Sequence, residues 1–221
     1  MIKLKDILFE SSTPNLLIPR RIEGRVERYI RATIQKYIKD GSKGDLDLSG
    51  LYLIKFPSNL KNIVVDGNFN CSSNELTSLQ GAPTSVGGYF YCDFNNLTSL
   101  DGAPTSFSGD FSCSHNNLTS LNGAPKSVGG RFNCNYTNLT SLDGAPNSVG
   151  GDFDCHGNKL TSLDGSPTSV GGYFNCSSNK LTSLDGAPKS VSGNFNCSLN
   201  TKKFTKDEVR AVCDVRRTIY V

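Results

Sequence analysis

The sequence is poor in several residue types on which many enzymes and membrane proteins depend. It contains no tryptophan, one methionine and two histidines among 221 residues. No apolar run approaches the roughly 18 residues that a membrane-spanning helix needs. Residues 1–10 are charged and lack the apolar core of a signal peptide. We therefore expect no contact with a membrane, and a location in a cytoplasm or in a particle assembled there.

The sequence also offers few groups that could converge into a catalytic or metal site. Zinc sites use two cysteines separated by two to four residues, and no such pair occurs. His115 and His156 fall at different positions of the repeat described below, about 10 Å apart by strand spacing. There is no phosphate-binding loop. We predict no catalytic residue, no metal and no cofactor, and an unrecognised enzyme is the least favoured of three function classes.

A 21-residue unit repeats over residues 65–200. Its consensus is close to L-T-S-L-x-G-A-P-x-S-V-G-G-x-F-x-C-x-x-N-x, with cysteines 21 residues apart from Cys71 to Cys197 and phenylalanines in step from Phe69 to Phe195. A fixed period of this length is typical of a solenoid, in which each unit buries its apolar side against the next. The alternation of Phe and Cys predicts a short strand with one buried face. Stacked coils then form a parallel sheet with a spacing of about 4.8 Å.

The rest of each unit contains the turn-forming residues Gly-Gly and Pro, and we expect its return path to be irregular or a single 3₁₀ turn. Seven of the eight cysteines occupy one inward position, and Cys213 lies outside the repeat. This spacing favours buried free thiols over disulfides, and therefore a reducing compartment.

The repeat resembles the leucine-rich repeat, L-x-x-L-x-L-x-x-N-x-L, with Phe at the second Leu position and Cys at the third. The matching asparagines are Asn74, Asn95, Asn116, Asn158, Asn179 and Asn200, and Thr137 interrupts the series. The resemblance implies a mainly β solenoid with a parallel sheet on one face, helical caps and asparagines bonded to the turn backbone. The consensus also resembles repeat proteins encoded by large tailed phages and some bacteria.

Three segments follow from these patterns. Residues 1–45 form a leader and helical cap, residues 46–200 the solenoid, and residues 201–221 a second helical cap. The first helix is predicted over residues 22–40, with a C-cap at Gly41. Its apolar stripe consists of Ile22, Val26, Tyr29, Ile30, Ile34, Tyr37 and Ile38. An irregular first repeat begins at Leu46, followed by an inserted loop over residues 59–65.

The predicted first helix has a basic face. Arg21, Arg25, Arg28 and Arg31 lie on it. The face is either simply solvated or a secondary docking site for an anionic partner. Nucleic acid is the less favoured partner because no aromatic residues are interleaved with the arginines.

In the second cap, Thr205 and Glu208 predict a capping box. Val209, Val212 and Cys213 are predicted to form its apolar helical face. Residues 219–221 are a candidate last strand.

The columns flanking Phe and Cys vary between repeats and point away from the core. Aromatic and charged residues gather there on adjacent coils: Tyr89, Tyr91, Asp93, Phe94, Asp110, His115, Arg131 and Tyr136. This composition favours a protein-binding face, since exposed Tyr, Phe and Arg are enriched at interface centres. The alternative is that these side chains simply cover the sheet.

These features together predict a non-enzymatic protein-interaction or structural module. One version is a phage virion-associated protein that docks on phage structural proteins, and Leu8-Phe9-Glu10 resembles the cleavage motif of phage head-protein leaders. The other version is an intracellular, effector-like protein that binds a host protein. The sequence leaves the oligomeric state open.

Overall fold

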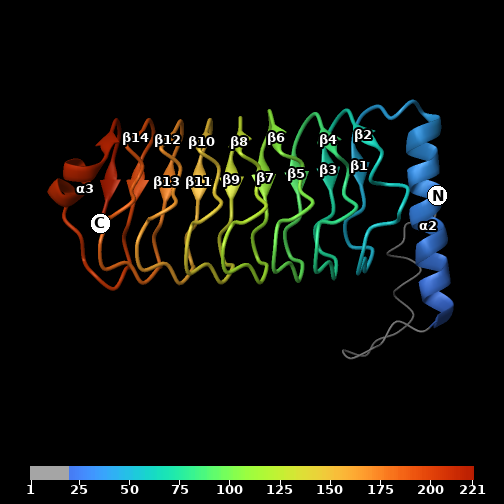
Figure 1. Cartoon of the computed structure of the whole chain (residues 1–221), viewed down its shortest axis with the longest axis horizontal. Helices are drawn as coiled ribbons and strands as arrows, with labels where there is room; N and C mark the ends of the chain where they lie inside the picture. The colour runs from blue at the N-terminus through green and yellow to red at the C-terminus, as the bar shows by residue number, and fades with distance from the viewer. Residues whose placement is uncertain (1–19) are drawn as a thin grey trace.

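A computed structural model describes residues 20–221, apart from the side chains of residues 20–23, 106 and 107. The predicted leader at residues 1–10 lies outside the described residues. Coils stack into a solenoid with helix α2 (Arg20–Lys39) at one end and helix α3 (Lys206–Val212) at the other (Figure 1). Neither helix of this described part is long and apolar enough to cross a membrane.

One short strand per coil forms a nine-stranded parallel sheet along the solenoid. Its strands, in spatial order, are β1 (Leu46–Asp47), β3 (Phe69–Asn70), β5 (Phe90–Tyr91), β7 (Phe111–Ser112), β9 (Phe132–Asn133), β11 (Phe153–Asp154), β13 (Phe174–Asn175), β15 (Phe195–Asn196) and β17 (Ile219–Tyr220). In the repeats, each Phe pairs with the Phe of the next coil. The predicted parallel sheet and the predicted last strand are confirmed.

A second set of strands lies on the return path. These strands are β2 (Val64–Val65), β4 (Ser85–Val86), β6 (Ser106–Phe107), β8 (Ser127–Val128), β10 (Ser148–Val149), β12 (Ser169–Val170), β14 (Ser190–Val191) and β16 (Asp214–Val215). The even-numbered strands from β6 to β16 form a six-stranded sheet, and β2 pairs with β4. The prediction of an irregular or 3₁₀ return path was therefore wrong. The Ser-Val dipeptide alternates outward and inward, and it too stacks in register.

The core consists of columns of identical side chains. Phe, Cys and the two Leu of each repeat are buried along the solenoid, and the Val of the return path lies beside them. All eight cysteines are free and buried, as predicted. The inserted loop predicted at residues 59–65 is present over residues 59–63, with Leu60 and Ile63 buried in this core. Its predicted end was wrong, because Val64 and Val65 form β2.

The asparagine column joins each coil to its neighbours. The Asn116 amide donates to the carbonyls of Cys92 at 3.0 Å and Cys113 at 2.9 Å, and its oxygen accepts from the Leu97 N–H at 3.0 Å. Thr137 bonds differently, as its place in the sequence suggested. Its hydroxyl donates to Asn158 Oδ1 at 2.7 Å and to its own coil at Cys134.

Helix α2 covers the first coil with Val26, Ile30, Ile34 and Tyr37. Tyr29 and Ile38 are exposed, so the predicted stripe was too wide. A helix advances about 100° per residue, and only the i, i+4, i+8, i+11 series keeps facing the coil. Gly41 ends the helix with φ +81°, and its N–H donates to the Ile38 carbonyl at 3.0 Å.

Helix α3 begins with the predicted capping box. The Glu208 N–H donates to Thr205 Oγ1, and the Thr205 N–H donates to the Glu208 carboxylate. Val209 and Cys213 are buried, but Val212 is exposed. The helix ends at Val212, and Cys213 is already extended, so the predicted apolar face does not continue through both residues.

We predict that Asn116→Ala lowers the free energy of unfolding by about 3 kcal/mol or more, because it leaves several buried backbone groups without partners. Thr137→Asn should instead raise it by about 1 kcal/mol, because the amide can restore the bonds that the other coils have. Urea unfolding of both variants beside wild type provides the measurement. A cost for Thr137→Asn as large as that for Asn116→Ala would contradict this account of the column.

We also predict that stability falls at alkaline pH. Burial raises the pKa of the Cys92, Cys113 and Cys134 thiols well above their usual range. Below about pH 8.5 both the folded and unfolded chains hold these protons; above it only the unfolded chain ionises, so unfolding is favoured. Urea midpoints at pH 7.5 and pH 10 test this, and equal midpoints would contradict it.

Candidate functional site

The candidate site lies on the outward side of the nine-stranded sheet, where most coils follow a common hydrogen-bonding pattern. At the position between Phe and Cys, an Asn or Asp accepts a bond from the N–H two residues later. Asn70, Asn133, Asp154, Asn175 and Asn196 all do so. The side-chain oxygen thereby satisfies a backbone donor at the end of each short strand.

Two adjacent coils depart from this pattern. Tyr91 and Ser112 stand where the other coils have Asn or Asp. In the second of these coils, Asp93 of the preceding coil takes over the bond, since its Oδ1 accepts from the Ser114 N–H at 2.9 Å. The hydroxyls of Ser112 and Ser114 also donate to this oxygen. The chain thus places a tyrosine at a position where the fold uses an amide.

In a second column, side chains that accept a backbone bond from the next coil alternate with larger side chains that do not. At the position before Phe, the side-chain oxygens of Asn68, Asp110 and Asp152 accept the backbone N–H of the next coil. The intervening coils carry Tyr89, Arg131 and Tyr173 at this position. Their backbone N–H groups donate these bonds, and their side chains do not act as acceptors for the next coil. The Tyr89 and Tyr91 ring centroids lie 5.7 Å apart on one strand. The larger side chains contact other side chains instead: Arg131 pairs with Asp152, and Tyr173 bonds to Asn196.

A row of aromatic rings runs across four coils beside these columns. Phe94 stacks on His115 with ring centroids 4.3 Å apart, and His115 stacks on Tyr136 at 5.0 Å. His156 meets the Tyr136 ring edge-on at 4.6 Å. Phe94 is 56% exposed and Tyr136 is 51% exposed. We call Phe94, His115, Tyr136 and His156 the ring stack.

Three members of the ring stack adopt a backbone conformation that is unfavourable for large side chains. Phe94, His115 and Tyr136 have φ of +53°, +52° and +46°. The equivalent residues in other coils include Ser73, Gly157 and Ser178, which make the same turn. A left-handed non-glycine residue costs roughly 1–2 kcal/mol, so the turn itself does not require these aromatic side chains.

The charges of the face are unevenly paired. Arg131 Nη2 lies 3.2 Å from Asp152 Oδ2, and His156 Nδ1 lies 2.7 Å from Asp154 Oδ1. Asp93 and Asp110 form no salt bridge within residues 20–221. Partial burial, reinforced by Asp110, Tyr89 and Asp93, raises the pKa of Tyr91, which Arg131 opposes. Negative charge is therefore concentrated near the two tyrosines.

The structure brings the eight predicted face residues onto three successive coils. Asp110 and Asp93 serve as backbone acceptors, and Arg131 is engaged by Asp152. Sequence reasoning missed His156 as a member of this cluster. It occupies a different column from the other rings, and it reaches Tyr136 because Gly157, in the ring column, has no side chain.

The predicted secondary site on α2 is also on the surface. Arg25, Arg28 and Arg31 are exposed, and the Arg21 side chain lies outside the described part of the chain. Arg28 Nε donates to the Gly24 carbonyl at 3.0 Å. This face has no geometry that selects a ligand beyond its positive charge.

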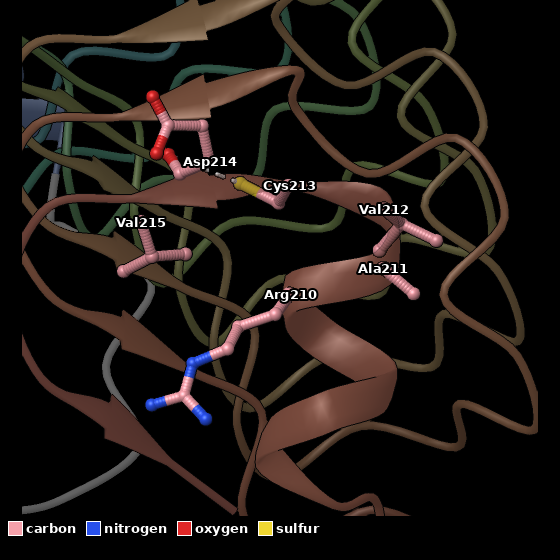
Figure 2. Close-up of a pocket in the computed structure, with 6 residues that line it drawn as sticks. All are labelled: Arg210, Ala211, Val212, Cys213, Asp214 and Val215. Carbon is pink, nitrogen blue, oxygen red and sulfur yellow. Dashed lines mark hydrogen bonds between the residues drawn. The ribbon is translucent and has the colours of Figure 1, made fainter.

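Residues 20–221 contain no group of three or more His, Cys, Asp or Glu side chains that could hold a metal ion. A pocket of about 470 Å³ lies where α3 meets β16, lined by residues 210–215. Figure 2 shows the Arg210 side chain pointing away from Cys213 and Asp214, so no charged groups converge there.

Comparisons with known proteins bear on the fold. No family model matches the chain, and no curated protein matches it by sequence. Eight chains of solved structures match it. One is the leucine-rich repeat domain of a Shigella effector, with a TM-score of 0.64, 21% identity, and coverage of 93% of this chain and 90% of that chain. The chain therefore has the leucine-rich repeat fold.

We predict that Phe94→Gly changes the free energy of unfolding by no more than about 1 kcal/mol. Losing a ring contact costs about 0.5–1.5 kcal/mol, and relief of the left-handed backbone offsets most of it. Phe132→Ala, at a buried position of the same solenoid, should cost about 3–5 kcal/mol. Urea unfolding compares the two. Equal losses would mean that the ring stack serves stability rather than binding.

Proposed function

We propose that this chain is a non-enzymatic protein-binding module whose binding face is the outward side of the nine-stranded sheet between Tyr89 and His156. The observation that carries the proposal is the local departure from the repeat. At Tyr91 the chain forgoes an acceptor that other coils provide, and at Phe94 and Tyr136 it places aromatic side chains at a left-handed turn where Ser73, Gly157 and Ser178 stand in other coils. The core needs neither, so selection for an external contact accounts for both.

The composition of the face supports a protein partner. Tyrosine, phenylalanine and arginine supply rigid contact area and are enriched at the energetic centres of interfaces. The side chains are held on adjacent strands about 4.8 Å apart, so a partner meets a preorganised surface. A small-molecule substrate would require convergent groups in an enclosed pocket, which this open face does not provide.

Two versions of the biological role follow. In the first, the module binds a host protein, as an effector would, and the similarity to the Shigella effector domain supports this version. In the second, it docks on phage structural proteins, and the resemblance of its repeat consensus to phage-encoded proteins supports this version. The identity of the bound protein distinguishes them.

We predict that changing Tyr89, Tyr91, Phe94 and Tyr136 to alanine abolishes capture of the partner without unfolding the chain. Wild type and variant serve as baits in native or infected lysates, with bound proteins identified by mass spectrometry. Tyr220→Ala is the matched control, since Tyr220 is 48% exposed in β17 at the far end of the same sheet.

A partner lost with the fourfold variant and kept with Tyr220→Ala supports the face. A partner kept by both variants removes function from this face. A further bait with Arg25, Arg28 and Arg31 changed to glutamine then tests whether the basic face of α2 is the docking site.

A further inference from the structure

The proposed binding face has surplus negative charge at one end. Its outward columns carry four carboxylates, at Asp93, Asp110, Asp152 and Asp154, and one guanidinium, at Arg131. Asp152 is paired with that guanidinium and Asp154 with His156. Asp93 and Asp110 have no cationic partner among residues 20–221. The unbalanced charge therefore lies on the coil that carries Tyr89 and Tyr91 and on the coil that follows it.

The structural role of these two carboxylates does not require a charge. Asp110 Oδ1 accepts the Arg131 N–H at 2.7 Å. In the same column Asn68 accepts the Tyr89 N–H at 2.8 Å through its amide oxygen, and Asn194 accepts the Thr218 N–H. Asn would thus satisfy the backbone equally well. Asp93 likewise acts through Oδ1 alone, so each carboxylate has a second oxygen with no bond assigned to the fold.

Aromatic surface lies beside these carboxylates. The Tyr89 and Tyr91 rings are 5.7 Å apart, on the same coil as Asp93 and next to the coil of Asp110. Phe94 stacks on His115 of the following coil with an interplanar angle of 8°. The preceding coil has Ser73 at this position, so the opposite face of the Phe94 ring has no ring neighbour in the described chain. Partial burial raises the pKa of Tyr91, and the charges of Asp110 and Asp93 raise it further.

We infer that this end of the face binds arginine side chains of the partner protein, an inference that rests on the proposed binding function. We call it the arginine site; it consists of Tyr89, Tyr91, Asp93, Phe94 and Asp110. A guanidinium stacks flat on an aromatic ring and donates two parallel hydrogen bonds to a carboxylate. The lysine ammonium is more strongly hydrated and does neither as well. The partner therefore presents an exposed, arginine-containing segment.

Fluorescence anisotropy with labelled nona-arginine and nona-lysine peptides tests the inference. Wild type should bind the arginine peptide more tightly than the lysine peptide. Asp93→Asn combined with Asp110→Asn should weaken arginine-peptide binding by about tenfold, while retaining the Oδ1 acceptors and the urea midpoint. The matched control combines Asp143→Asn with Asp185→Asn, which removes the same charge from exposed turns outside the face.

Equal weakening by the two double variants, or equal affinity for the two peptides, would reduce the effect to net charge and overturn the arginine site. The natural partner gives an independent outcome. If the fourfold aromatic variant loses the partner while Asp93→Asn with Asp110→Asn keeps it at full affinity, the binding face stands and the arginine inference fails. If the aromatic variant keeps the partner, the proposed binding function itself fails.

Discussion

The hydrogen bonds between successive coils are the constraint on which the rest of this structure depends. Each strand of the nine-stranded sheet donates its N–H groups to the next coil, as when Phe132 and Cys134 donate to the carbonyls of Asp152 and Asp154 at 2.8 Å. These hydrogen bonds hold adjacent backbones at a fixed distance, so every coil must follow the same path. Where the backbones meet most closely, side chains are excluded: a Cβ at Gly150 would lie 2.1 Å from the Gly129 carbonyl oxygen. Buried polar groups must then be satisfied from neighbouring coils, which is the work of the asparagine column.

Such a constraint separates two kinds of position. Inward side chains touch their own copies on both sides, so a change in one coil affects its neighbours. Outward side chains need only leave the backbone bonds intact. Asp93 shows how this freedom is used, because it supplies the acceptor that Ser112 lacks and so allows the Ser112 coil to differ from the rest. Surface chemistry can therefore be concentrated on a few coils without altering the core.

This separation explains which features the sequence could predict. The 21-residue period identified the parallel sheet and the buried thiols, because each follows from identical residues stacking in register. The asparagine bonds were expected from the resemblance to leucine-rich repeats. The return-path sheet was missed because each of its Ser-Val pairs has a single apolar residue, which shows no alternation, whereas the Phe strands continue to an inward Cys. The residues of the outward face were predicted from strand alternation and composition, but the hydrogen bonds between these residues were not. The exchange between Asp93 and Ser114, and the contact of His156 with Tyr136, join different columns of neighbouring coils, which comparison within a column does not reveal.

The exchange at Asp93 also bears on the proposed binding face. The face has no enclosed pocket, so affinity must come from side chains whose conformations are fixed before binding. Stacking on His115 restrains Phe94, and hydrogen bonds to the next coil restrain Asp93 and Asp110. The bonds that satisfy the backbone thus also orient the charge that faces solvent. Replacing aspartate with asparagine separates the two roles, since the amide keeps the orientation and removes only the charge.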